Sequence, residues 1–242
     1  MIIDMHTHYH NYEHLGEGVR LTFEEFIHEL DFHGIDKAVV SNAFGLESDF
    51  VSGNRLLFEF MERYPDRIIG FLALHPCFPE ESRALLREGV ARGIKGVKLH
   101  CELSFVPYDD PRHLALVEEV ASCNLPVTIH TGSSYIQPSV TLAKTFPNTC
   151  FLFGHTGGLA YHPMVQAIKK MDNVIADLAG NVFLDGFIET IVNTLGEDRV
   201  VYASDFVFMD PVIMLSMVRT ARISDAGKEK ILSGNAQRIL KL

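Results

Sequence analysis

The chain opens with Met1-Ile-Ile-Asp-Met-His-Thr-His-Tyr-His10, and this stretch decides how the rest of the sequence is interpreted. Two apolar residues lead into Asp4, His6 and His8. Alternate side chains of a β-strand share one face, so we expect these three side chains to point the same way. Two imidazoles on neighbouring positions of one face can bind a single metal ion. Because His-x-His pairs also occur in ordinary surface strands, a metal site needs support from residues in the later strands.

The composition is that of a globular chain with a large core. The 242 residues are 47% hydrophobic and carry a net charge of −10. An acidic surface argues against nucleic acid or an anionic membrane as a partner. The four cysteines show no Cys-x-x-Cys spacing and are interpreted as reduced thiols. No leader pattern and no apolar run of membrane length is seen, so the sequence predicts a cytoplasmic protein.

Eight short apolar runs alternate with helical stretches along the chain. Their nearly continuous hydrophobicity and β-branched content are typical of parallel strands buried on both faces. Eight strands, each followed by a helix, predict one α/β domain over residues 1–242, a (β/α)8 TIM barrel. An open doubly wound sheet is the alternative, but no Gly-x-Gly-x-x-Gly motif follows the first strand. The predicted strands are Ile2–His8, Lys37–Ala43, Ile68–His75, Ile94–His100, Pro126–His130, Cys150–His155, Val174–Leu178 and Arg199–Asp205.

Helix start and stop signals support this division. Thr22 and Glu25 form a capping box at the start of an amphipathic stretch that ends near Gly34. A second helix is predicted over residues 54–64. Asp110-Pro111 and Asp210-Pro211 each place an N-cap residue before a proline at the first helical position. A last helix is predicted over residues 224–240.

Histidines end most of the predicted strands, and Asp205 ends the eighth. In (β/α)8 barrels the active site lies at the C-terminal ends of the strands. Half of the twelve histidines would therefore lie on one rim, which predicts a metal site. Imidazole and carboxylate ligands suit Zn²⁺ first, and then Mn²⁺, Fe²⁺, Co²⁺ or Ni²⁺. These histidines are His6, His8, His75, His100, His130 and His155.

The rim residues belong to motifs that run in order through the whole chain. The motifs are Asp4-Met-His-Thr-His8, Gly96-Val-Lys-Leu-His100, Pro126-Val-Thr-Ile-His130-Thr-Gly, Phe153-Gly-His155-Thr-Gly-Gly, Tyr202-Ala-Ser-Asp205 and Ser233-Gly-Asn-Ala-Gln. Through these motifs the sequence resembles the amidohydrolase superfamily, and most closely the branch of aminocarboxymuconate-semialdehyde decarboxylase-like enzymes and related "amidohydrolase 2" hydrolases.

The resemblance implies a barrel that holds one divalent metal ion. By motif match, His6, His8 and His130 would be ligands, and Asp205 would be both a ligand and the general base. His155 would lie beside the metal, where it would polarise the substrate or help to activate water; in binuclear relatives this histidine is a ligand.

Four other polar residues are candidates near the site. Lys98 would be a carbamylated bridge between two metal ions in a binuclear relative, and otherwise a lysine paired with a buried carboxylate. His100 would lie behind the ligands, face the substrate or have a structural role, and His75 is interpreted as structural or pocket-lining. Asp177 would orient a ligand imidazole.

The chain departs from the family pattern at two places. Cys101 stands where relatives often carry proline after Lys-x-His. Aromatic-acid decarboxylases commonly carry an arginine on strand 2, and this chain has none at the end of that strand. In the first loop, His10, Tyr12 and His14 border the site and would either contact the substrate or simply form a polar loop.

The residues favour a metal-dependent hydrolase. Metal-bound hydroxide, formed with Asp205 as the base, would attack the carbonyl carbon of a small amide, lactone or cyclic substrate, and either the metal or His155 would polarise that carbonyl. One alternative is non-hydrolytic, metal-dependent decarboxylation of a small unsaturated or aromatic acid, with His155 or Asp205 moving the proton. Another is a barrel that binds metal or ligand without turnover. The partner would be a small molecule, and a homo-oligomer is compatible with the sequence.

Overall fold

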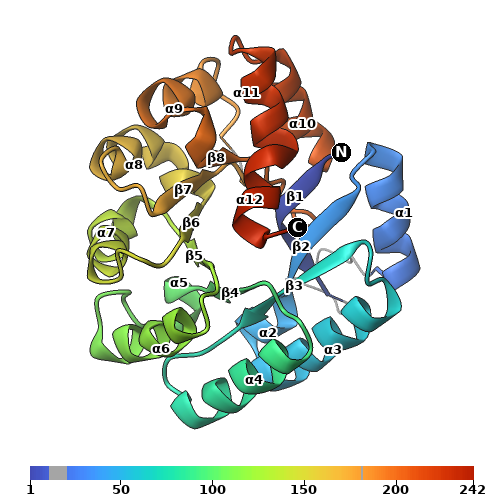
Figure 1. The fold of residues 1–242 in the computed structure, drawn as a ribbon, viewed down its shortest axis with the longest axis vertical. Helices are drawn as coiled ribbons and strands as arrows, with labels where there is room; N and C mark the ends of the chain where they lie inside the picture. Colours follow the sequence, from blue (N-terminus) through green and yellow to red (C-terminus); the bar gives the residue numbers. More distant parts are fainter. Residues whose placement is uncertain (11–20, 181) are drawn as a thin grey trace.

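Eight parallel strands form one sheet in the order β1 to β8 in the computed structural model, which describes residues 1–10, 21–180 and 182–242. Each strand pairs with the next along the chain, and the strands surround a central axis with the helices outside (Figure 1). The predicted (β/α)8 TIM barrel is confirmed. The strands are β1 (Ile3–Tyr9), β2 (Lys37–Asn42), β3 (Ile68–Ala73), β4 (Gly96–Leu99), β5 (Val127–His130), β6 (Phe151–Gly154), β7 (Val174–Asp177) and β8 (Val200–Val201).

The helices mostly begin where their capping signals predict. Thr22 and Glu25 form the capping box of α1, and Gly34 ends this helix with a φ of 71°. Helix α3 starts before the predicted residue 54 because the Asp49 carboxylate accepts from the backbone N–H groups of Val51 and Ser52. The helices are α1 (Phe23–His33), α2 (Ala43–Glu47), α3 (Phe50–Arg63), α4 (Pro79–Ala91), α5 (Cys101–Ser104), α6 (Pro111–Ser122), α7 (Ile136–Thr145), α8 (Tyr161–Ile168), α9 (Phe187–Leu195), α10 (Pro211–Thr220), α11 (Asp225–Glu229) and α12 (Asn235–Leu240).

The last strand is much shorter than the predicted Arg199–Asp205. After β8 the chain leaves the β7 ladder and closes the barrel against β1 instead. The Met5 N–H donates to the Tyr202 carbonyl at 3.0 Å, and the Asp205 N–H donates to the His6 carbonyl at 2.9 Å. Asp205 itself has a φ of 67°, so it lies in a left-handed turn rather than in a strand. This seam brings Asp205 beside His6, which lies near the opposite end of the chain.

The side chains at the start of β1 do not alternate between the two faces of the sheet as the sequence predicts. The pairing of β1 with β2 shifts between Asp4 and Thr7, so β1 has one extra residue there. Such a bulge breaks the two-residue period of a strand. The Asp4 carboxylate accepts from the backbone N–H groups of His6 and Ser204, at 3.2 and 3.0 Å. The expectation that Asp4 shares one face with His6 and His8 does not hold.

Two apolar layers pack on the two sides of the sheet. The larger layer lies between the strands and the surrounding helices. The smaller one fills the barrel interior, where α12 packs across one end (Figure 1). Its buried residues are Ile3, Met5, Val39, Ile69, Phe71, Leu152, Ile175, Val201, Ala236, Ile239 and Leu240.

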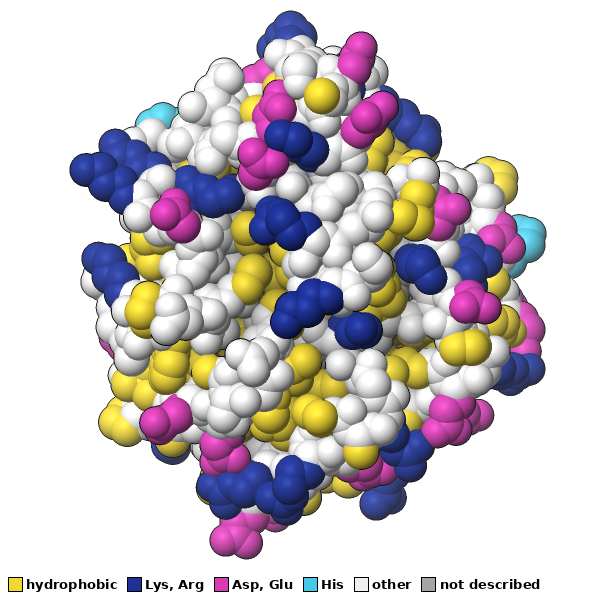
Figure 2. Space-filling view, in the orientation of Figure 1, with side chains coloured by type: hydrophobic (Ala, Val, Ile, Leu, Met, Phe, Trp, Pro, Cys, Tyr) yellow, Lys and Arg dark blue, Asp and Glu magenta, His cyan; other side chains and the backbone are white. Residues whose placement is uncertain are grey.

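The face that α12 covers carries basic, acidic and apolar side chains, and histidine is visible only at its periphery (Figure 2). Helix α12 packs with Ile3 and Ile69, which lie at the starts of β1 and β3, so the carboxyl ends of the strands are at the opposite end of the barrel. Across the described ranges, no helix combines the length and the apolar character needed to cross a membrane.

Helix α2 lies against α3 through two glycines. A Cβ atom on Gly53 would be only 2.4 Å from the backbone of Gly45, so we expect Gly53→Ala to separate the two helices. Overpacking of this kind costs about 1–3 kcal/mol. In a chain of this size each kcal/mol lowers Tm by roughly 2–4 °C, which calorimetry can measure.

Gly234→Ala is the matched control, because an added Cβ there would meet nothing closer than 3.9 Å. We expect its Tm to be unchanged or slightly higher, since alanine favours helix. Equal Tm values for the two variants would contradict the close helix contact.

Candidate metal centre

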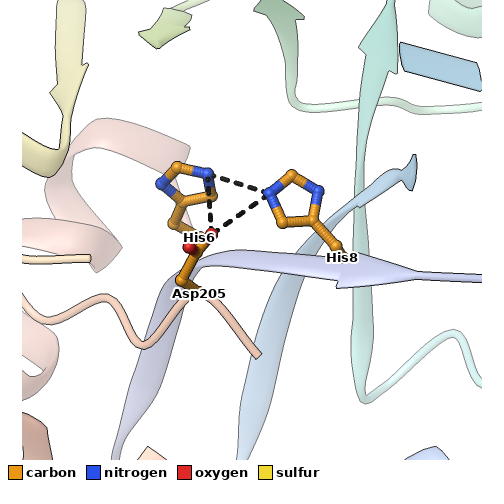
Figure 3. A group of neighbouring side chains, drawn as sticks. All are labelled: His6, His8 and Asp205. Atoms are coloured by element: carbon orange, nitrogen blue, oxygen red, sulfur yellow. Dashed lines mark hydrogen bonds and ion pairs between the residues drawn. The ribbon is translucent and has the colours of Figure 1, made fainter. Parts of the chain in front are cut away.

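Three side chains converge at the carboxyl end of the barrel. His6 and His8 project from β1, and Asp205 follows β8 (Figure 3). The two Nε2 atoms are 3.2 Å apart. Asp205 Oδ1 lies 3.3 Å from His8 Nε2 and 3.7 Å from His6 Nε2. The three atoms form a compact triangle, two of whose corners come from one strand.

Hydrogen bonds at the far side of each ring fix which nitrogen faces the triangle. His6 Nδ1 is 2.8 Å from Asp177 Oδ2. His8 Nδ1 is 3.3 Å from the Ser41 carbonyl and 3.2 Å from the Ser41 hydroxyl. Carboxylates and carbonyls only accept, so each Nδ1 carries the proton and each Nε2 of a neutral ring presents a lone pair. Burial lowers the pKa of His6 well below its usual value, which keeps that ring neutral.

The triangle fits a divalent metal ion. Zinc binds imidazole nitrogen and carboxylate oxygen at about 2.0–2.2 Å, so tetrahedral ligands lie roughly 3.3–3.5 Å apart. The observed separations of 3.2, 3.3 and 3.7 Å lie close to this range. Two lone pairs and a carboxylate oxygen facing one point repel one another unless a cation lies among them. Because imidazole and carboxylate suit several divalent ions, the donor set does not single out zinc.

The pKa of Asp205 lies below its usual range. Burial raises this pKa, but His155, His8 and His6 outweigh burial when they carry a proton, and Lys98 is a further cation that interacts with Asp205. Asp177 is also buried, and burial raises its pKa to about 6 despite the opposing effects of His155 and Lys98. Asp177 contacts His6 in the manner of a residue that orients a ligand imidazole.

Lys98 lies inside the barrel beside His6. Its Nζ is 2.7 Å from His6 Nε2, and the residue is 2% exposed. Burial lowers the pKa of Lys98 to about 8, while Asp177 and Asp205 act against this shift. The ammonium group therefore contacts the same nitrogen that faces the metal triangle.

Three further rim histidines form a second group next to the triangle. The ring of His155 has its centroid 5.0 Å from that of His6 and 4.5 Å from that of His130. The rings of His100 and His130 stack with centroids 3.9 Å apart. Burial lowers the pKa of all three rings, so they are neutral.

His130 is the predicted ligand that lies outside the triangle. Its Nε2 is 3.6 Å from a carboxylate oxygen of Glu102, which comes from helix α5. The His100 side chain caps that same helix by accepting from the Leu103 N–H at 3.4 Å. Ligation by His130 stays a prediction.

The turn that carries His155 is held by two buried threonines. His155 and Thr156 have φ values of 66° and 46°, in the left-handed region. The Thr131 hydroxyl donates to the Gly154 carbonyl at 2.7 Å and accepts from the Gly157 N–H at 2.8 Å. The Thr156 hydroxyl donates to the Asp177 carbonyl at 2.7 Å. The sequence did not reveal these positioning roles, because the hydroxyl partners lie on other strands.

The remaining sequence candidates lie further from the triangle. His75 follows β3 and accepts from the Cys77 N–H at 3.2 Å, and its ring contacts Phe50 and Phe78. His10 is buried with its ring 5.9 Å from that of Phe208. Tyr12 and His14 fall outside the described residues.

A small pocket of about 110 Å³ opens above the triangle. Two short helices, α2 and α5, supply apolar walls that the sequence did not identify, because each helix spans only a few residues after its strand. Glu47 of α2 adds a carboxylate. The lining residues are His8, Ala43, Leu46, Glu47, His100, Leu103, His130, His155, Asp205 and Phe208.

The sequence profile of the family described as Amidohydrolase matches residues 3–242. The chain belongs to the amidohydrolase superfamily. This confirms the resemblance carried by the six motifs and makes the chain a member of a superfamily of enzymes. No curated protein matches the sequence.

Solved structures with the same barrel include several decarboxylases. The 2,6-dihydroxybenzoate decarboxylase from Rhizobium is 17% identical, with a TM-score of 0.81 over 99% of this chain and 98% of that one. A dihydroxybenzoic acid decarboxylase from Polaromonas sp. JS666, with bound manganese and 2-nitroresorcinol, is 18% identical, with a TM-score of 0.80 over 100% and 97%. The 5-carboxyvanillate decarboxylase from Sphingomonas paucimobilis is 16% identical, with a TM-score of 0.81 over 100% and 99%.

These neighbours correct one expectation. The sequence favoured a hydrolase, but these three similar structures are decarboxylases, so the findings match the decarboxylase alternative better. The prediction of hydrolysis was wrong because a Lewis-acid metal, a carboxylate and a histidine can serve hydrolysis and decarboxylation alike.

We expect His6→Ala and His8→Ala each to reduce bound metal from about one ion per chain to near zero, since each removes one donor of the triangle. Plasma mass spectrometry after equilibration with Mn²⁺ or Zn²⁺ measures this. His162→Ala, which removes an exposed imidazole on α8, should keep the wild-type metal content. Full metal content in His6→Ala would place the metal elsewhere.

Proposed function

We propose that this protein is a metal-dependent decarboxylase of a small aromatic or unsaturated carboxylic acid. The observation that carries the proposal is the metal triangle at the floor of a small pocket with apolar walls. The decarboxylases with the same barrel support it, and the one from Polaromonas sp. JS666 contains manganese. A flat acid would place its ring between the apolar side chains and its carboxylate at the triangle.

His6, His8 and Asp205 would hold the divalent ion, with His130 as the further predicted ligand. The ion would supply an electropositive centre for the substrate's oxygen atoms. Among the described residues that line the pocket there is no arginine or lysine, so this centre would also take the place of the strand-2 arginine common in aromatic-acid decarboxylases.

The chain's own residues would transfer one proton to the substrate carbon that loses carbon dioxide. Decarboxylation breaks a carbon–carbon bond, releases carbon dioxide and leaves an electron pair on carbon that must receive a proton. Asp205 is held ionised and can accept a proton from the substrate or from water. His155 Nδ1 is 3.2 Å from the Ala179 carbonyl, to which it donates, so its Nε2 lone pair is available at the pocket. These two groups would pass the proton to the carbon.

We expect the manganese-loaded protein to release carbon dioxide from at least one member of a panel of hydroxylated benzoates and small unsaturated acids. Carbon dioxide is trapped, and the decarboxylated product is identified by mass spectrometry. His155→Asn should lower kcat by about 100-fold or more, because it removes a proton carrier. Asparagine tolerates the left-handed φ at this position, so the turn should persist.

His75→Asn is the matched control, since His75 is a rim histidine outside the pocket lining. It should keep wild-type kcat and metal content. Carbon dioxide release from no acid in the panel, together with turnover of an ester or amide, would overturn the proposal.

A second variant tests the turn behind His155. Thr131→Val removes the hydroxyl that joins Gly154 to Gly157 while it preserves the side-chain shape. We expect kcat to fall by about tenfold with KM little changed, because His155 loses its position rather than its chemistry. Thr131→Ser should restore most of the activity; equal loss in both variants would contradict the hydroxyl's role.

A further inference from the structure

Lys98 is a cation in the interior of the barrel, directly beside the metal triangle. It lies on β4, and its side chain is among the largest that the barrel buries completely. The charged groups that act on it are Asp177 and Asp205, one on each side of the ligand His6. A buried ammonium group needs such neighbours, because burial otherwise disfavours its charge.

The contact that matters joins Lys98 Nζ to His6 Nε2 at 2.7 Å. His6 Nδ1 carries the ring proton, since it donates to Asp177. Nε2 therefore has one lone pair, which accepts from the Lys98 ammonium in this structure. A metal ion at the triangle needs the same lone pair.

We infer that Lys98 and the divalent metal ion compete for His6 Nε2, so that Lys98 limits how tightly the site binds metal. The inference rests on the metal site of the proposed function. To bind the ion, His6 must give up its hydrogen bond to Lys98, and the ammonium must move aside while it stays close to a second positive charge. Both effects weaken metal binding.

The opposite role for Lys98 makes the opposite prediction. A lysine that ligated the metal, directly or after carbamylation, would strengthen binding, and its removal would weaken it. The sign of the change in affinity therefore decides between the two roles.

The experiment compares the affinity of the metal-stripped full-length protein for Mn²⁺ with that of Lys98→Met. Methionine keeps the length and removes the charge and the donors. We expect Lys98→Met to bind Mn²⁺ at least about tenfold more tightly, measured at one fixed pH by competition with a chelator. Activity is not needed for this readout.

Lys95→Met is the control for net charge. Lys95 immediately precedes β4 and lies three residues before Lys98, roughly 10 Å along the strand direction. Its removal changes the net charge equally but leaves His6 untouched, so Mn²⁺ affinity should match wild type. An equal gain in Lys95→Met would show a general charge effect and overturn the inference.

The remaining outcomes of the Mn²⁺ measurement also separate the inference from the proposed function. Unchanged binding by folded Lys98→Met overturns the inference, and weaker binding both overturns it and favours Lys98 as a ligand. Lys98→Gln, which keeps a neutral donor, provides a second variant if the first does not fold, and we expect its affinity to lie above wild type. Absence of binding by every variant would refute both the inference and the metal site. Tighter binding without carbon dioxide release would refute the proposed reaction alone.

Discussion

The structure of the site depends on one electrostatic constraint: two imidazole nitrogens with lone pairs face one carboxylate oxygen within 3.7 Å. Such an arrangement is unfavourable without positive charge. The hydrogen bonds from each Nδ1 to Asp177 and Ser41 hold the rings in this orientation. The neutral rings of the other rim histidines supply no charge, so the positive charge must come from Lys98 or from a bound ion.

The barrel seam assembles this arrangement from the two ends of the chain. Strand β8 is short, and the segment that follows it pairs with β1 just beyond the bulge, where Thr7 lies opposite Phe206. The hydrogen bond from the Asp205 N–H to the His6 carbonyl fixes the carboxylate opposite the imidazoles. His155 and Asp205 both adopt left-handed conformations, which aim side chains in directions that a regular strand would not allow.

Much of the fold could be predicted from the sequence, because eight apolar runs and clear capping residues determine local structure. The grouping of His6, His8 and Asp205 followed from their places at strand ends. Features set by tertiary contacts could not be predicted. The register shift after Asp4 lies where β1 also contacts the segment after β8, and the pocket walls come from four- and five-residue helices. The reaction was misjudged because the residues determine the available chemistry, whereas the substrate determines which reaction occurs.

Charge near the triangle links metal binding to substrate binding. The ionised groups around it are Asp177 and Asp205, opposed by Lys98, with Glu47 at the pocket wall. Before a metal binds, the net charge is negative, so a substrate carboxylate would be repelled. A divalent ion offsets this negative charge and gives the carboxylate a cation to contact, and the described pocket lining offers no arginine that could do the same. Metal occupancy would therefore control entry of an anionic substrate, and Lys98, by its contact with His6, would influence that occupancy without touching the substrate.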